Sequence, residues 1–322
     1  MMRAILAAAI LALGLGAAHA EDFPSRPITI IVPFAAGGPT DAVARAISDR
    51  MRISLGQPVI VENVTGAGGS IGTTRAVRAA PDGYTVCLGH TGTHVVNGAI
   101  YPLQYDLLND FAPIALLATN TMIVVTKKDV PPKNLRELID WLKANPGKVS
   151  VGTAGVGSAS HFSGVYFRDL IKAQFTFVPY RGTGPAMLDL VAGQIDMIVD
   201  QVSNAITQVK AGSIKAYAIA DTKRLATAPE IPTADEAGLP GFHISLWNAL
   251  WAPKGTPKDV IAKLNAAVVD ALNDPKVRKH LADVGLEIPP PERLTPEALG
   301  AYQKAEIEKW WPIIKAANIK VE

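Results

Sequence analysis

The sequence predicts an α/β fold, and two observations support this. Short apolar runs rich in β-branched residues are continuous rather than alternating, as in ITIIV (28–32) and YTVCL (84–88). Strands of this kind are buried on both faces, which is typical of a parallel sheet covered by helices. Segments with apolar residues at helical spacing lie between them, so strands and helices alternate and right-handed crossovers are expected.

The strand candidates share high β-propensity and flanking turn residues. In chain order they are 28–32, 59–62, 84–88, 113–117, 122–126, 148–152, 175–179, 195–199, 215–220 and 244–253. Helices are predicted where Val43, Ile47 and Met51 recur every four residues, and where 134–147 carries leucines on one face before a Pro-Gly stop. The segment 257–275 begins and ends with proline, and the chain beyond it is almost wholly helical in pattern.

The first twenty residues, MMRAILAAAILALGLGAAHA, predict a secretory signal peptide. Arg3 precedes an apolar run, and small residues lead to a cleavage site after Ala20. A membrane anchor is the alternative, but the run is shorter than the roughly 18–20 residues that a bilayer needs. We therefore expect an exported, periplasmic protein.

Two domains are expected from the length of 322 residues, at about 100–200 residues each. No linker of low complexity separates two halves, so the domains must be joined by strands that cross between them. The best candidates are ATNTMIVVTKKDVPP (118–132) and FHISLWNALWAPKG (242–255). The predicted domains are 21–122 with 248–322, and 123–247.

Composition excludes several classes of function. The formal charge is +2, and lysine and arginine are scattered without a basic stripe, so nucleic acid is not an expected partner. The single cysteine, Cys87, excludes an internal disulfide, and its apolar strand indicates an inert, buried thiol. His90 and His94 are four residues apart, but Thr-Gly-Thr between them is a poor helix, so no metal site is expected.

Three glycine-rich turns lie between a predicted strand and a predicted helix, at 34–40, 152–161 and 181–185. A helix N-terminus offers about four unpaired N–H groups and roughly half a positive charge, so it binds anions without a basic side chain. Gly37 and Gly38 allow close approach of a ligand, and Pro39 suits the first helical position. The alternative is an ordinary tight turn.

The second and third turns add side chains. Ser158 either caps the next helix or contacts a ligand, and the two roles are compatible. Arg181 either clamps a carboxylate through two hydrogen bonds or forms a surface salt bridge. Further glycine-rich stretches stand at 66–74 and 89–94. Several such turns facing one cleft would form an anion site.

Enzyme functions find less support. Gly68–Gly72 matches the G-x-S-x-G pattern of α/β hydrolases, with Ser70 as nucleophile, but five residues separate it from the preceding strand. A secreted serine hydrolase is thus the alternative function. The sequence contains neither a phosphate-binding P-loop nor a dinucleotide fingerprint, so no cofactor is expected.

Four motifs carry a family resemblance: VPFAAGGPTDAVAR, ENVTGAGGSIGTTRAVRAAPDGYT, VGTAGVGSASHFSG and VPYRGTGPAMLDLVAGQIDMIVD. From about Ser25 to the C-terminus, the chain resembles the periplasmic solute receptors of tripartite tricarboxylate transporters, also called Bug receptors. The resemblance implies a type II periplasmic-binding-protein fold: two Rossmann-like α/β domains joined by two crossing strands, with a ligand cleft between them.

The resemblance also implies a small carboxylate ligand, held largely by backbone N–H groups and ordered water. Asp41 is expected to brace its loop; Asp200 either tunes ligand choice or caps the next helix. Phe34, Trp247 and Trp251 either line the site or belong to the core. Carried onto this sequence, the expected ligand-binding residues are Phe34, Ala36, Gly37, Gly38, Thr40, Thr91, Thr93, Thr153, Gly155, Ser158, Ser160, His161, Arg181 and Asp200.

The expected function is therefore capture of a di- or tricarboxylate, an acidic amino acid or an aromatic acid by a monomeric, non-enzymatic receptor. The receptor would deliver this ligand to the integral membrane subunits of a transporter.

Overall fold

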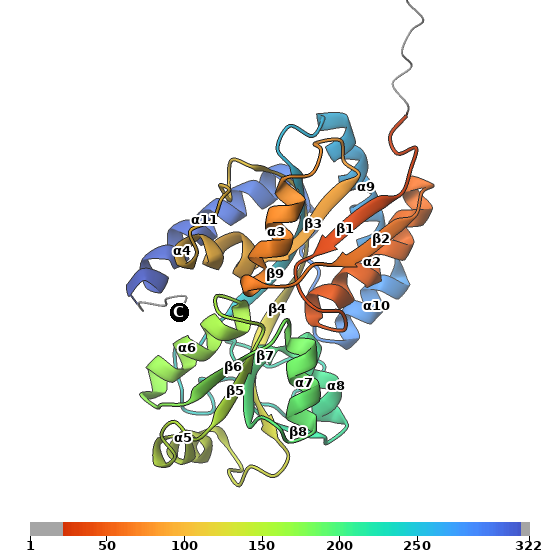
Figure 1. The fold of residues 1–322 in the computed structure, drawn as a ribbon. Coiled ribbons are helices and arrows are strands. Elements are labelled where there is room, and N and C mark those ends of the chain that lie inside the picture. The colour runs from red at the N-terminus through yellow and green to blue at the C-terminus, as the bar shows by residue number, and fades with distance from the viewer. Residues whose placement is uncertain (1–21, 317–322) are drawn as a thin grey trace, which may run out of the picture.

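The computed structural model describes residues 22–316, so the predicted signal peptide lies outside the described residues. Figure 1 shows two α/β units, one above the other, with long strands running between them. The neighbouring pairs of strands form one path in the order β2-β1-β3-β9-β4-β7-β5-β6, with β8 paired to β4. None of the described helices is both long enough and apolar enough to cross a bilayer.

The first domain combines the N-terminal strands with the C-terminal helices. Its strands are β1 (Ile28–Val32), β2 (Val59–Asn63) and β3 (Thr85–His90). Its helices are α2 (Pro39–Leu55), α3 (Ser70–Val77), α4 (Asn97–Ile100), α9 (Lys258–Asn273), α10 (Pro275–Asp283) and α11 (Pro296–Ala316), with the short helices η1 (Ala67–Gly69), η2 (Gly92–Val96) and η3 (Pro291–Arg293).

The second domain is built from the middle of the chain. Its strands are β5 (Ser150–Thr153), β6 (Thr176–Pro179), β7 (Met197–Gln201) and β8 (Ile214–Ile219). Its helices are α5 (Leu135–Ala144), α6 (Ala159–Ile171), α7 (Thr183–Val191) and α8 (Val202–Lys210).

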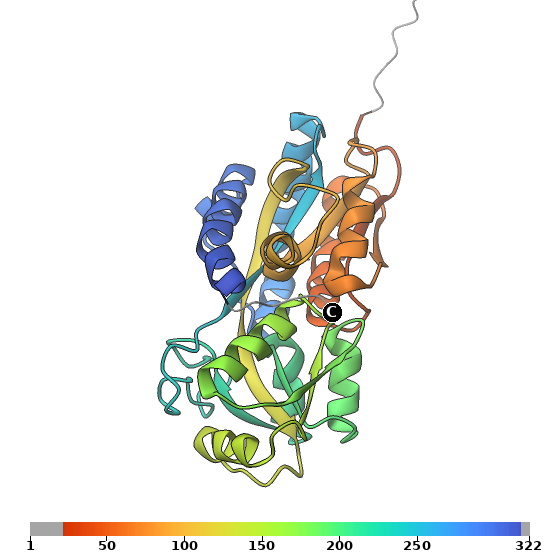
Figure 2. The ribbon, with the colours of Figure 1, turned by 60° about the vertical axis from the view of Figure 1, so that its left-hand side comes forward.

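Two antiparallel strands, β4 (Phe111–Lys127) and β9 (Ser245–Pro253), connect the domains. β4 pairs with β9 from Phe111 to Thr121, and then with β7 and β8 from Met122 onward. Figure 2 shows β4, in yellow, passing from the upper domain into the lower one. These are the crossing strands that the sequence predicts, whereas the domain boundaries at 122/123 and 247/248 remain predictions.

Two strand predictions need correction. The runs 113–117 and 122–126 are not separate strands but parts of β4, because residues 118–121 stay extended by pairing with β9. The sheets are also mixed rather than wholly parallel. The pairs β1–β2, β1–β3, β5–β6 and β5–β7 are parallel, but every pair that includes a crossing strand is antiparallel.

Each domain buries a hydrophobic cluster on both faces of its sheet. In the first domain, α2 and α9 cover one face and α11 covers the other. In the second, α5 and α6 cover one face, while α7 and α8 cover the other. Phe162 of α6 joins a first-domain cluster, where its ring meets Trp310 at 5.3 Å between centroids. The two cores therefore touch near α11.

Buried polar contacts fix the aromatic core of the first domain. Trp247 and Trp251 are fully buried, and their indole N–H groups donate to Glu306 and Gln303 of α11. These two tryptophans therefore belong to the core. Cys87 is buried as expected, and burial raises the pKa of its thiol to about 12.

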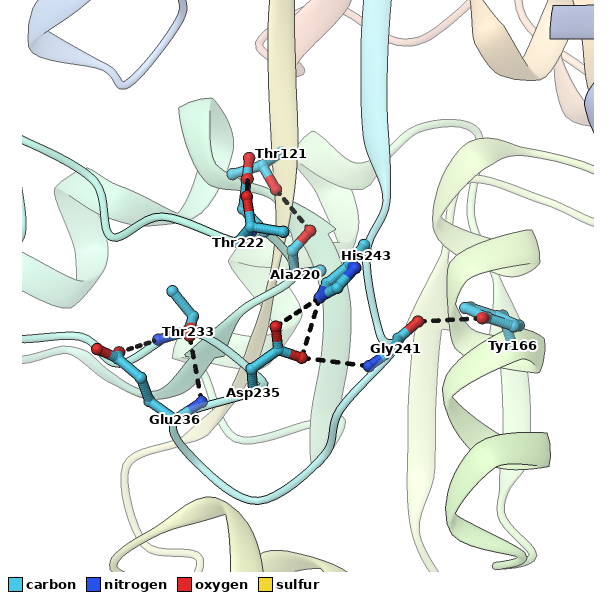
Figure 3. Close-up of polar contacts among 10 residues, drawn as sticks. Thr121, Tyr166, Ala220, Thr222, Thr233, Asp235, Glu236, Gly241 and His243 are labelled. Atoms are coloured by element: carbon cyan, nitrogen blue, oxygen red, sulfur yellow. Dashed lines mark hydrogen bonds and ion pairs between the residues drawn. The ribbon is translucent and has the colours of Figure 1, made fainter.

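The point where β4 changes partners is held by Thr121, whose hydroxyl bonds Ala220 O at 3.1 Å and Ile244 O at 3.3 Å. Figure 3 shows this contact beside the long segment that links β8 to β9. That segment is closed on itself by Asp235, which contacts His243 Nε2 at 2.9 Å and accepts from Gly241 N–H at 3.2 Å. Thr121 thus ties β4 to the residue that follows β8 and to the residue that precedes β9.

Candidate functional site

Two adjoining cavities lie where the glycine-rich turns of the two domains meet. The inner cavity is lined by Phe34, Gly38, Pro39, Thr40, His90, Ala154, Ser158, Ala159, Ser160, Thr183 and Gln201, and its volume is about 20 Å³. This volume suits roughly one water molecule. The outer cavity has a volume of about 630 Å³ and is lined by Gly66, Ala67, Gly68, Tyr101, Ala154, Gly155, Val156, Pro179, Tyr180, Arg181 and Pro185. Ala154 borders both cavities.

The turn between β1 and α2 forms one wall of the inner cavity. Gly37 adopts φ +79°, a conformation that favours glycine, and Gly38 is the N-cap of α2. Asp41 braces this turn as expected: its carboxylate accepts from Gly37 N–H and from Asn63 Nδ2, both at 2.9 Å. Burial opposes ionisation of Asp41, but hydrogen bonds from Arg45, Gly37 and Asn63 outweigh it and lower its pKa.

The turn between β5 and α6 forms the opposite wall. Ser158 is the N-cap of α6, and its hydroxyl accepts from His161 N–H at 3.3 Å. The Ser160 hydroxyl accepts from Ala154 N–H at 2.8 Å. Ser158 therefore caps the helix and also lines the inner cavity.

The turn between β6 and α7 contributes a third helix N-terminus and a direct link between the domains. Ala35 N–H donates to Arg181 O at 3.0 Å. Gly184 lies against the first turn so closely that a Cβ on it would be 3.0 Å from Gly38 N. At these two turns the domains thus meet backbone against backbone, with no room for a side chain at Gly182 or Gly184.

Three helix N-termini therefore converge on the inner cavity. Among the described residues, the N–H groups of Thr40, Ala159, Ser160 and Thr183 donate to no other protein group. None of the described lysines or arginines lines this cavity. Unpaired amides at the starts of helices carry partial positive charge, so the arrangement suits a small anion.

Histidines in this region are neutral. Burial lowers the pKa of His90 and of His161 to about 4, and the charge of Arg168 acts in the same direction at His161. His90 stacks on Phe34 at 4.8 Å between ring centroids, and its Nδ1 accepts from Gly92 N–H at 2.8 Å. Burial lowers the pKa of His94, and the neighbouring His90 acts in the same direction. The His94 ring stacks on Trp251 at 3.6 Å between ring centroids.

Asp200 lies behind the inner cavity rather than on its surface. It is fully buried, and its carboxylate accepts from Gln201 N–H at 2.8 Å and from Asn204 Nδ2 at 2.5 Å. Burial raises its pKa to about 6, although hydrogen bonds from Asn204, Gln201 and Thr183 act in the opposite direction. The side chain thus joins the first turn of α8 to the start of α7.

The structure brings together part of the predicted site. The predicted residues that line the inner cavity are Phe34, Gly38, Thr40, Ser158 and Ser160; Gly155 and Arg181 line the outer one. Those that line neither are Ala36, Gly37, Thr91, Thr93, Thr153, His161 and Asp200. The hydroxyls of Thr91 and Thr93 instead bond Trp247 N–H and the backbone of His90.

Several lining residues were not among the predicted ones. His90, Thr183 and Gln201 border the inner cavity, and Tyr101 and Tyr180 border the outer one. Three of them stood in stretches that the sequence singled out: His90 in the glycine-rich stretch 89–94, and Tyr180 and Thr183 in the motif of the third turn. Tyr101 and Gln201 carried no sequence signal.

Ser70 does not have the environment of a hydrolase nucleophile. It begins α3 after the short helix η1, and not directly after a strand. Within residues 22–316, no histidine is hydrogen-bonded to its hydroxyl. The geometry of the cleft does not favour the hydrolase alternative.

Comparison with known proteins agrees with this geometry. Residues 43–319 match the family model of the tripartite tricarboxylate transporter family receptor, TctC. The chain belongs to this family. A relative from Agrobacterium vitis, described as the UPF0065 protein in the TAR-I ttuE-ttuC' intergenic region, is 43% identical over 303 residues, covering 94% of this chain and 87% of the relative.

Two solved structures show the same fold at high identity. The periplasmic binding protein BugD is 41% identical, with a TM-score of 0.90 and coverage of 93% of this chain and 100% of BugD. MatC from Rhodopseudomonas palustris, solved with bound malate, is 44% identical, with a TM-score of 0.88 and coverage of 91% and 100%. The periplasmic-binding-protein fold and the Bug-type family implied by the sequence motifs are both confirmed.

The buried histidines predict acid sensitivity. The pKa of His90 is about 4 in the folded chain but about 6.5 when unfolded, so its contribution to stability is complete above pH 6.5 and is lost as the pH falls through 4. Between pH 7 and pH 5 the free energy of unfolding should fall by about 2 kcal/mol through this residue. Urea denaturation of His90→Gln should show a correspondingly smaller loss.

The matched control is His280→Gln, which replaces an exposed histidine on α10. Its loss of stability between pH 7 and pH 5 should equal that of the wild type. An unchanged pH dependence in His90→Gln would contradict the assignment of a neutral, buried His90.

Proposed function

We propose that the protein is a non-enzymatic receptor that captures a small carboxylate and delivers it to a membrane transporter. The observation that carries this proposal is the convergence of three helix N-termini, with unpaired amides and no cationic side chain, on one cavity between two domains. A carboxylate oxygen accepts several such hydrogen bonds at once. Malate in MatC is a carboxylate of this kind, which supports the ligand class.

In this proposal the two cavities bind different parts of the ligand. The inner cavity receives the carboxylate group, which all candidate ligands share. The outer cavity receives the remainder of the ligand, since about 630 Å³ falls within the usual range for small-molecule sites. Ligand contacts would involve the predicted residues that line the two cavities, together with His90, Thr183 and Gln201.

Capture requires a hinge motion. The domains touch through Ala35, Arg181 and Gly184, so the inner cavity is closed to a ligand of several carbon atoms. Rotation about the crossing strands β4 and β9 would open it. A ligand that bonds amides of both domains then stabilises the closed state by its higher affinity for that state.

Export and delivery complete the proposal. The predicted signal peptide would place the receptor in the periplasm, with cleavage after Ala20. The partners would be the integral membrane subunits of a tripartite tricarboxylate transporter, and the receptor would act as a monomer. Mass spectrometry of the exported protein tests the cleavage site.

A thermal-shift panel of di- and tricarboxylates, acidic amino acids and aromatic acids tests the ligand class. At about a hundredfold excess over Kd, a bound ligand should add about 2.7 kcal/mol to the free energy of unfolding. Amides of the same carbon skeletons serve as controls and should produce no shift. The proposal fails if no carboxylate changes the melting temperature.

Gly38 provides a mutational test of the inner cavity. A Cβ at this position meets only ordinary contacts, 3.5 Å from Ala35 O and from Gly184 N, so Gly38→Ala should fold normally. The longer side chain of Gly38→Val should enter the inner cavity and abolish binding in calorimetry, with little change in urea denaturation. Wild-type affinity in Gly38→Val would place the carboxylate elsewhere.

Arg181 should act on the rate of association. It is exposed, borders the outer cavity, and its guanidinium has no ion-pair partner among the described residues. We expect Arg181→Gln to slow association of an anionic ligand at low salt and to leave dissociation unchanged. Stopped-flow fluorescence measures both rates, and Arg136→Gln on α5 is the matched control. Equal association rates in the two variants would make Arg181 a surface charge without a role in binding.

A further inference from the structure

Helix α4 directs two side chains toward glycine-rich turns of different domains. Asn97 Nδ2 donates to Gly68 O at 3.1 Å, within the first domain. Tyr101, at the end of the same helix, donates its hydroxyl to Val156 O at 2.5 Å, in the second domain. Tyr101 is the C-cap residue of α4, with an extended backbone. A Cβ on Gly157 would meet both the Tyr101 ring and Asn97 Oδ1, so the two side chains lie side by side.

The two turns that these side chains hold are in direct contact. A Cβ on Gly68 would be 2.4 Å from Val156 O, and a Cβ on Gly157 would be 2.6 Å from Cε2 of the Tyr101 ring. Gly68 and Gly157 both have positive φ, at +58° and +75°. Glycine at these positions lets the ring and the two backbones approach without an intervening side chain.

We propose that Tyr101 is a positioning residue for ligand binding, whose hydroxyl fixes the 155–158 turn of the second domain against the first domain. Val156 lies two residues before Ser158, the N-cap of α6. Ser158 N–H donates to Gly155 O at 3.1 Å, which closes a tight turn around Val156. Holding the Val156 carbonyl therefore aims the free amides of Ala159 and Ser160 at the inner cavity. This inference rests on the proposed function, in which that cavity receives a carboxylate.

The hydrogen bond belongs to the closed state alone, because its partners lie in different domains. Tyr101 is half-buried, which limits competition from water, and burial raises the pKa of its phenol, so the donor keeps its proton. An interaction present only in the closed state stabilises that state with or without ligand. Its loss should therefore appear mainly as faster ligand dissociation.

The test compares Tyr101→Phe with Tyr166→Phe. Both changes delete a hydroxyl that bonds a backbone carbonyl, but Tyr166 bonds Gly241 O at 3.1 Å, within the second domain (Figure 3). A carboxylate that binds the wild type is first found with the thermal-shift panel. Stopped-flow dissociation should then be about 2- to 10-fold faster in Tyr101→Phe and unchanged in Tyr166→Phe. If the ligand dissociates from Tyr101→Phe no faster than from Tyr166→Phe, the inference is overturned and the proposed function stays intact.

A second measurement needs no ligand. Nitroxide labels on Ile53→Cys of α2 and Leu188→Cys of α7, both at exposed positions in different domains, report the distance between the domains by electron–electron double resonance. Without ligand, Tyr101→Phe should shift the distance distribution toward the open state, and Tyr166→Phe should not. If the wild type binds no carboxylate, the proposed function fails, yet this measurement still decides the role of Tyr101. Identical distributions in both variants would overturn that role.

Discussion

The site depends on backbone N–H groups that have no partner at the starts of three helices. Such groups are normally satisfied by caps, water or ligands, because an unpaired buried amide is costly. Here Gly38 and Gly182 occupy N-cap positions without a capping side chain, and within residues 22–316 the amides of Thr40 and Thr183 have no acceptor. On the proposed function, the ligand itself supplies the missing acceptor, which couples binding to closure.

The close contact between the domains in turn depends on glycine at the turns. Gly182 and Gly184 lie against Ala35 and the Gly37–Gly38 peptide, with no space for a Cβ at ordinary distance. The contact surface between the turns is therefore backbone against backbone. Such surfaces gain little from hydrophobic burial, so their stability is sensitive to single hydrogen bonds such as Ala35 N–H to Arg181 O.

Much of the fold follows from the sequence, because continuous apolar runs and helical spacing act locally. The continuity of β4 does not, since the polar stretch 118–121 looks like a break until β9 lies beside it. The glycine-rich turns were recognisable, and so was the bracing role of Asp41. Tyr101 was not, because it meets Val156 across 55 residues of chain, and no local pattern carries a pairing of that kind. Asp200 lies in a predicted site motif, but the packing of α7 and α8 orients its carboxylate toward Asn204.

In a receptor of this design, the inner and the outer cavity contribute differently to specificity. The amides that line the inner cavity cannot be changed by substitution without altering the backbone, so on the proposed function the fold itself fixes recognition of the carboxylate group. The outer cavity is lined by side chains such as Tyr101, Tyr180 and Arg181, which substitution can change freely. On the proposed function, discrimination between carboxylates arises in the outer cavity. Tyr101 lines this cavity and also bonds Val156 O across the domain boundary. A substitution at this position would change selectivity and the closed-state population at once, so the two effects have to be separated by measuring dissociation and ligand-free closure in the same variants.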